Sequence, residues 1–208
     1  MAKKGFTLAE VLIVLGIIGI VAALTIPSLI TKYRRMTVEA KLKKFYSTMN
    51  QAAKLSQEDN EGFPSLDTTG VVDHDNADLI ENYYKNYILK YMQGVQYEKV
   101  GKGDLKVILS DGSGFFSYLQ KDETMPNPTL WIMYCLSTSD YKHCHRDNYD
   151  GKNQFLFYFD TEKGYMDTVK FPNDRSSCYN TNPAYRHACS QLIKDNGWKI
   201  PDDYPWIK

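Results

Sequence analysis

One charged side chain, Glu10, lies near the start of an otherwise apolar run that extends from Phe6 to Ile30. As a helix, this run would be roughly 37 Å long, enough to cross a hydrocarbon core of about 30 Å. A charged residue at the centre of a membrane helix costs on the order of 2.5–3.5 kcal/mol, so such residues are usually paired and functional. The sequence therefore predicts a membrane helix in which Glu10 has a partner.

The other side chains with metal-binding chemistry form two weak patterns. His143-Cys144-His145 and His187 are zinc ligand types, but adjacent residues seldom converge on one ion and no C-x-x-C pair occurs. Oxygen ligands for calcium surround Gly151, although their spacing misses the EF-hand loop and Asp-Gly also suits a plain turn; they are Asp147, Asn148, Asp150 and Asn153. We expect no metal or other cofactor. Since the sequence has no nucleophile elbow, P-loop or dinucleotide fingerprint, we also expect no enzyme.

The first residues of the chain follow a specific pattern. Lys4, Gly5, Phe6, Thr7 and Glu10 stand at fixed places at the start of the apolar run. This pattern closely resembles the prepilin processing site of type IV pilins and type II secretion pseudopilins. The resemblance implies cleavage between Gly5 and Phe6 by a prepilin peptidase, N-methylation of Phe6, and a role for Glu10 in methylation and subunit docking.

Two positions further along the run also match this family. Gly19 and Pro27 correspond to a glycine and a proline that weaken the helix, and the resemblance implies that the helix can melt between them inside a filament. Pro27 removes the hydrogen bond to the Ala23 carbonyl, so we expect a kink there.

Cleavage after Gly5 would create a positively charged amine at Phe6, about 6 Å along the helix axis from Glu10. Within one subunit the two charges point to different parts of the helix. A neighbouring helix displaced along a filament axis could instead set its amine against Glu10. Pairing would then offset the cost of burying the Glu10 carboxylate, which a single subunit in lipid does not offset. Glu10 would in this way set the register between stacked helices.

Two plainer interpretations of the apolar run compete with this one. An ordinary secretory signal peptide has a shorter run of roughly 7–15 residues and a small-residue cleavage site, for which Val21-Ala22-Ala23 could serve. Such a peptide would not carry an acid near its start. A simple single-span anchor explains the length of the run but not Glu10.

The pilin resemblance places the rest of the chain outside the cytoplasm, where disulfides are the default state of cysteines. The four cysteines allow three pairings and are Cys135, Cys144, Cys178 and Cys189. The sequence does not resolve their connectivity, and we favour the pairs nearest in sequence, Cys135–Cys144 and Cys178–Cys189. The second pair would lie where pilins often carry a disulfide-bounded carboxy-terminal loop.

Hydrophobic periodicity of 3.6 residues predicts two helices after the membrane run. Residues 31–57 continue as an amphipathic helix whose apolar stripe is Val38, Leu42, Phe45, Met49, Ala52 and Ala53. A polar, turn-rich stretch follows to residue 75. The second helix is predicted over 76–92, with Asp75 or Asn76 as its cap and Gly94 at its end.

After Gly94 the apolar period changes to two residues, which predicts strands. The predicted strands are 104–109, 115–120, 129–135, 154–160 and 164–171. Short connections such as Asp111-Gly112 imply an antiparallel sheet, one face of which the helix stripe can cover. Asn182-Pro183 should open a last helix that Gly197 ends, and the aromatic tail 198–206 should pack on the head as a strap.

These elements predict an α+β fold, in which a long amino-terminal transmembrane and amphipathic helix packs on an antiparallel β-sheet head, as in type IV pilins. The expected divisions are a leader peptide at 1–5, a transmembrane helix at 6–30, its amphipathic continuation at 31–57 and a globular head at 58–208. The whole chain has 43% hydrophobic residues and 16 tyrosines, so a core can form. The 25 basic and 25 acidic residues balance, so no bulk attraction to nucleic acid is expected.

We interpret the chain as a structural subunit of a type IV filament, and within that class as a type II secretion-type pseudopilin that polymerises through its amino-terminal helix. The alternatives are a major or minor pilus subunit in adhesion or DNA uptake, and a membrane-tethered periplasmic binding module that does not polymerise. Expected partners are prepilin peptidase, identical or related pilin subunits and an inner-membrane assembly platform. The expected location is the inner (cytoplasmic) membrane, with one span and the head outside the cytoplasm, and then a periplasmic or cell-surface filament.

Overall fold

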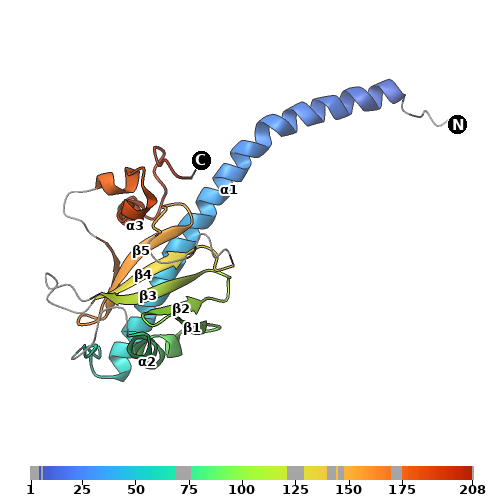
Figure 1. The fold of residues 1–208 in the computed structure, drawn as a ribbon. Coiled ribbons are helices and arrows are strands. Elements are labelled where there is room, and N and C mark those ends of the chain that lie inside the picture. Colours follow the sequence, from blue (N-terminus) through green and yellow to red (C-terminus); the bar gives the residue numbers. More distant parts are fainter. Residues whose placement is uncertain are drawn as a thin grey trace.

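The first helix, α1, spans Leu8–Asp59 and continues through Pro27 without a break. The computed structural model describes residues 5, 7–68, 76–120, 129–139, 144, 148–169 and 175–207. Figure 1 shows α1 projecting from the head and bending within its projecting part. This bend agrees with the kink expected from Pro27, which lacks the N–H that would bond the Ala23 carbonyl.

The second half of α1 packs on the sheet through one apolar stripe. All members of the predicted stripe are buried, and Ser56 is buried with them: Val38, Leu42, Phe45, Met49, Ala52, Ala53 and Ser56. The ring of Phe45 stacks on Tyr134 with 4.2 Å between centroids, and it also contacts Phe115 and Phe157. Fully burying a large apolar side chain contributes about 1.5–3 kcal/mol, so this stripe is the main attachment between helix and sheet.

The sheet is a six-stranded antiparallel meander in which each strand pairs with the next one in the chain. Its strands are β1 (Gln96–Val100), β2 (Asp104–Ile108), β3 (Gly114–Gln120), β4 (Thr129–Cys135), β5 (Gln154–Asp160) and β6 (Tyr165–Thr168). The five predicted strands are present. The last one is shorter than predicted, since β6 ends at Thr168 and Val169 no longer belongs to it, and the predicted end, Phe171, lies outside the described residues. The α+β class is therefore confirmed.

Strand β1 was not predicted, because nearly all of its side chains are exposed. An edge strand with no buried face lacks the alternation of apolar and polar residues that marks a strand in sequence. Its pairing with β2 becomes visible only in the structure, where Glu98 lies opposite Lys106 and accepts a hydrogen bond from its Nζ at 2.7 Å.

The opposite edge strand, β6, is closed by α1. The side-chain Nδ2 of Asn50 donates to the Met166 carbonyl at 3.0 Å, and its Oδ1 accepts from the Met166 N–H at 2.9 Å. Asn50 therefore satisfies the two backbone groups of Met166, which would otherwise be open at this edge. The helix is joined to the sheet by polar contacts as well as by its apolar stripe.

The second helix is shorter than predicted. It comprises α2 (Ala77–Tyr87) followed by a 3-10 turn, η1 (Leu89–Tyr91), rather than one helix over 76–92. Both Ile88 and Leu89 are buried. Ile88 has a non-helical φ of −125°, so α2 ends there and the 3-10 turn that follows places Leu89 in the core as well. Asn76 stands at the cap position but makes no capping hydrogen bond through its side chain, and Asp75 lies outside the described residues.

The predicted carboxy-terminal helix is divided. Short 3-10 turns, η2 (Arg175–Tyr179) and η3 (Pro183–Tyr185), precede a separate helix α3 (Cys189–Asp195). Asn182 caps η3 by accepting a hydrogen bond from the Ala184 N–H at 3.1 Å. Between η3 and α3 the guanidinium of Arg186 donates to the carbonyls of Asn180 and Thr181, which folds this segment back on itself.

The tail after α3 packs on the head as the predicted strap. Ile200, Tyr204 and Ile207 are buried. The Tyr204 hydroxyl donates to the Gly151 carbonyl at 2.5 Å, and the ring of Trp206 lies under the Arg186 guanidinium. The tail therefore joins the β4–β5 connection to the α3 region.

The packing of α1 gives a first prediction. Replacing Phe45 by alanine should lower the free energy of unfolding of the head by about 3–5 kcal/mol, because it leaves a cavity against Tyr134. Lys43→Ala, on the exposed face of the same helix, should change it by less than about 0.5 kcal/mol. Urea unfolding of the full chain in detergent, followed by near-ultraviolet circular dichroism, measures both. Equal losses in the two variants would show that the stripe is not the attachment.

Candidate assembly site at the start of α1

Glu10 closes the amino-terminal end of α1 together with Thr7. The Thr7 N–H and the Thr7 hydroxyl both donate to Glu10 Oε2 at 2.8 Å, and the Glu10 N–H donates to Thr7 Oγ1 at 3.3 Å. This reciprocal arrangement is a capping box, which satisfies N–H groups that the first turn of a helix otherwise leaves open.

Thr7 was not predicted to cap the helix, although the signal is present in the sequence. Threonine followed three residues later by glutamate is the capping-box pattern, and here it directly precedes an apolar run. The box corrects one expectation about Glu10. The carboxylate of a single subunit already has partners in its own chain and lies at the positive end of the helix dipole, so part of its burial cost is offset before any neighbour arrives.

The projecting part of α1 is apolar and exposed on every side. Its large side chains include Leu12, Leu15 and Ile18, which are 60%, 60% and 57% exposed. The most apolar 18-residue stretch of α1 has a mean hydropathy of 2.6, and none of it is buried. By length and composition α1 can therefore cross a membrane. Gly19 lies in the same part of the helix. A Cβ added to it would meet no atom within 4 Å apart from the backbone of its own helix. Phe6, the expected new amino terminus, lies outside the described residues.

The four cysteines form two disulfides, Cys135–Cys144 and Cys178–Cys189. These are the two pairs favoured from sequence spacing, and they leave no thiolate among the four to bind zinc. His187 lies against the ring of Tyr149, and burial lowers the pKa of its imidazole. His143 and His145 lie outside the described residues.

The acidic and amide residues around Gly151 form a turn. Oδ1 of Asp150 accepts hydrogen bonds from the backbone N–H groups of Lys152, Asn153 and Gln154 at 2.7–2.9 Å. Gly151 has a φ of +65°, which glycine adopts without strain. The Asp150 carboxylate is therefore engaged by the backbone of its own turn, as the plain-turn interpretation expects; Asp147, the first of the calcium candidates, lies outside the described residues.

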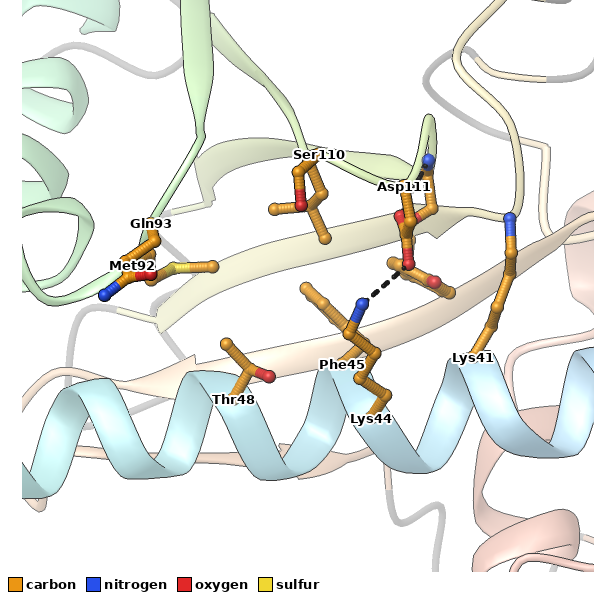
Figure 2. A pocket seen from close by; sticks show the side chains of 11 residues that line it. Lys41, Lys44, Phe45, Thr48, Met92, Gln93, Ser110 and Asp111 are labelled. Atoms are coloured by element: carbon orange, nitrogen blue, oxygen red, sulfur yellow. Dashed lines mark hydrogen bonds and ion pairs between the residues drawn. The ribbon is translucent and has the colours of Figure 1, made fainter.

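A small pocket of about 80 Å³ lies between α1 and the β2–β3 turn. Figure 2 shows Lys44 of the helix pointing to Asp111 of the turn, with Lys41 one helical turn away. Lys44 Nζ is 3.1 Å from Asp111 Oδ2, and Lys41 Nζ donates to the Leu136 carbonyl at 2.7 Å. Ligand pockets usually measure about 300–1,000 Å³, so we interpret this recess as part of the helix attachment.

Asp111 is the centre of this polar attachment. Burial alone would raise the pKa of its carboxyl group, but hydrogen bonds from the Ser113 hydroxyl and N–H and from Lys44 prevail and lower that pKa to about 2. A carboxylate with a depressed pKa stabilises the fold above its ordinary pKa of about 4, and this contribution is lost as the pH falls toward 2.

The second prediction follows from this pKa. Asp111→Asn should lower the free energy of unfolding at pH 6 by roughly 0.5–1.5 kcal/mol, the usual size of a lost hydrogen bond. The difference from wild type should shrink between about pH 4 and pH 2, since the wild-type carboxylate is then protonated as well. Glu58→Gln, which alters an exposed pair with Lys54, is the matched control. Unfolding curves at several pH values measure both variants, and a constant difference across this range would contradict the assignment.

Comparison with known proteins identifies two regions. Residues 28–171 and 162–207 match the model of a family described as Family of unknown function (DUF6613), and residues 1–26 match the Prokaryotic N-terminal methylation motif. No curated protein and no solved structure matches the chain. The methylation motif is the signal of the type IV pilin class, and it supports a pilin-like filament subunit that is anchored in a membrane with its head outside the cytoplasm. The chain belongs to the DUF6613 family, and it carries the type IV pilin-class signal at its amino terminus.

Proposed function

We propose that this chain is a type II secretion-type pseudopilin, a structural subunit that polymerises through α1. The observation that carries the proposal is the projecting part of α1, which is exposed throughout and has Glu10 as its only charge up to Ile30. A surface this apolar needs either lipid or other helices around it. The equal numbers of basic and acidic residues in the sequence favour secretion over DNA uptake, which would need a basic surface.

The proposed maturation begins with the first residues of the chain. Prepilin peptidase cleaves between Gly5 and Phe6, and the new amine of Phe6 is methylated. The capping box survives this cut, because Thr7 keeps its backbone N–H and its hydroxyl. Glu10 therefore remains bonded to the start of its own helix in the mature subunit.

Subunit docking uses Oε1 of Glu10, the carboxylate oxygen to which Thr7 does not donate. Both hydrogen bonds from Thr7 end on Oε2, and a carboxylate has about four acceptor sites on its two oxygens. The Phe6 amine of a neighbouring subunit can therefore bind Oε1 without displacing Thr7. This geometry supports Glu10 as the charge that sets the register between stacked helices.

Gly19 and Pro27 complete the proposed assembly segment. Glycine costs about 1 kcal/mol relative to alanine inside a helix, and proline removes one hydrogen bond. Both residues lie in α1, and the bend of its projecting part supports a weak point in that part of the helix. We propose that it melts when the subunit leaves lipid for the filament.

The proposed divisions are a leader at 1–5, a transmembrane helix at 6–30, its continuation at 31–57 and a head at 58–208. The proposed location is the inner membrane before assembly and a periplasmic filament afterwards. The proposed partners, besides the peptidase, are identical or related subunits and an inner-membrane assembly platform.

Deleting the chain from its host tests secretion directly: exported proteins should accumulate inside the cell, while adhesion by surface fibres and DNA uptake stay unchanged. Loss of surface fibres would instead show a pilus subunit.

The third prediction concerns processing. Intact-mass analysis of the protein purified from its host should show a chain that begins at methylated Phe6. Gly5→Leu should leave the uncleaved chain in the membrane, because the peptidase site then has a bulky side chain, whereas Ala2→Leu should be processed normally. A mature chain that begins after Ala23 would identify an ordinary signal peptide and would refute the filament proposal.

The fourth prediction separates the two roles of Glu10. Glu10→Gln should still insert and keep the capping box, since glutamine also serves at this position of the box. Its polymer yield should fall, because the Phe6 amine of each neighbour is then buried without a countercharge, and breaking a buried pair typically costs about 3–5 kcal/mol. Thr7→Ser, which keeps the hydroxyl, should polymerise like wild type.

The measurement is the amount of sheared polymer at matched membrane levels of each variant. Equal yields from wild type and Glu10→Gln would rule out Glu10 as the register charge. Absence of polymer from wild type would indicate the tethered module that does not polymerise.

A further inference from the structure

The head begins almost where the apolar run ends. The Arg34 guanidinium donates to Asn153 Oδ1 at 3.1 Å, and Arg35 donates to the carbonyls of Ile200 and Pro201 at 2.8 and 2.6 Å. On an α-helix these two arginines lie roughly 6–8 Å beyond Ile30 along the axis. The contacts therefore place parts of the head at the same level along the helix as the residues that immediately follow the run.

Two turns of the head lie at this level, residues 150–153 and residues 199–203, and we call them the juxtamembrane face. The face is held together and held to α1. Tyr204 joins the tail to the Gly151 carbonyl, and Glu39 of α1 accepts from Lys199 Nζ at 2.8 Å and from the Ile200 N–H at 2.9 Å. Figure 1 shows the tail beside α1 near the point where the helix leaves the head.

The depth of this face can be compared with the dimensions of a bilayer. The hydrocarbon core is about 30 Å thick and the whole bilayer about 40–45 Å, so each headgroup layer is roughly 5–8 Å deep. When Ile30 marks the end of the hydrocarbon, Arg34 and Arg35 fall within that depth. The turns that they contact extend from this layer toward the level of Glu39, roughly 13–14 Å beyond Ile30. We propose that the juxtamembrane face is seated in the phospholipid headgroup layer before assembly, which rests on the proposed insertion of residues 6–30.

The side chains of the face suit zwitterionic headgroups. Lys152 is exposed, the Lys199 side chain is 70% exposed and the Asp202 side chain is fully exposed. These cationic and anionic groups can meet the phosphate and the amine of a phospholipid. Tyr33 is 73% exposed at the same level of α1, and tyrosine is enriched at this depth in membrane proteins.

The consequence is that the membrane holds the head in one orientation. Arg34, Arg35 and Glu39 join the face to α1, so the exit of the helix is not a free hinge. Leaving the membrane for a filament would then require the face to exchange headgroups for another environment at the same time as the span exchanges lipid for helices.

Fluorescence quenching in phosphatidylcholine vesicles tests the depth of the face. The four native cysteines are in disulfides, so a single introduced cysteine can carry a polarity-sensitive dye. The full chain would be labelled at Asp202→Cys, at Tyr33→Cys as the headgroup reference, at Glu58→Cys near the far end of α1, and at Ile17→Cys within the run. One quencher is a lipid with a nitroxide on its headgroup, and the other carries the nitroxide on its acyl chain.

The expected result is that the headgroup quencher dims the dye at Asp202→Cys as much as the dye at Tyr33→Cys, and leaves the dye at Glu58→Cys unchanged. A dye at Asp202→Cys that behaves like the one at Glu58→Cys, while the acyl quencher dims Ile17→Cys, would overturn the seated head and leave the span intact. If the acyl quencher does not dim Ile17→Cys, the span is not inserted, and the proposed membrane anchor fails together with this inference.

A spacer variant provides an independent control. Eleven helix-forming residues inserted between Thr31 and Lys32 make about three turns and move the head roughly 16 Å away with little rotation. Quenching at Asp202→Cys should then fall to the level of Glu58→Cys. Mass analysis that shows both native disulfides would verify the head fold, and persistent quenching in the spacer variant would overturn the proposal.

Discussion

One unbroken helix has to satisfy two different environments, and the rest of the structure depends on this constraint. From Leu8 to Ile30, α1 exposes apolar side chains on every side, whereas from Val38 onward it buries a single stripe against the sheet. The change from a helix exposed on every side to a helix with one buried stripe takes place within about two turns and without a loop. A sheet with one apolar face covered by a helix is a stable layer, so the head can fold around the second half of α1 whatever surrounds the first half.

Polar contacts hold the helix on both flanks of that stripe. On one flank Asn50 bonds the backbone of β6 through Met166, and on the other Lys44 reaches Asp111 of the β2–β3 turn. Apolar packing alone is not directional, but these hydrogen bonds define the rotation and the axial position of α1. These contacts therefore fix the part of α1 that lies on the sheet as one body with the head.

Glu10 illustrates how one side chain can serve the subunit and its assembly. In the isolated chain it caps its own helix through Thr7, which lowers the cost of placing a carboxylate near lipid. In the proposed filament, it also receives the amine of a neighbour. The two roles are compatible because the capping bonds end on one carboxylate oxygen, so a neighbour adds a bond and breaks none.

The sequence by itself determined the elements in which the spacing of apolar residues indicates which side chains are buried. The stripe from Val38 to Ala53 could be predicted because one buried face repeats every 3.6 residues, and β2 because its burial alternates. Strands β3 to β5 could be predicted as short apolar and aromatic runs between turn residues, although they are buried on both faces over much of their length. The Thr7–Glu10 box is also a local pattern in the sequence, because both of its residues lie within one helical turn. Only the tertiary structure decided the exposed edge strand β1, the end of α2 at Ile88 and the division before α3, because each depends on contacts with residues outside its own segment. The pairing of β1 needs β2, Ile88 packs into a core shared with other elements, and Arg186 donates to the Asp150 carbonyl, 36 residues earlier in the chain.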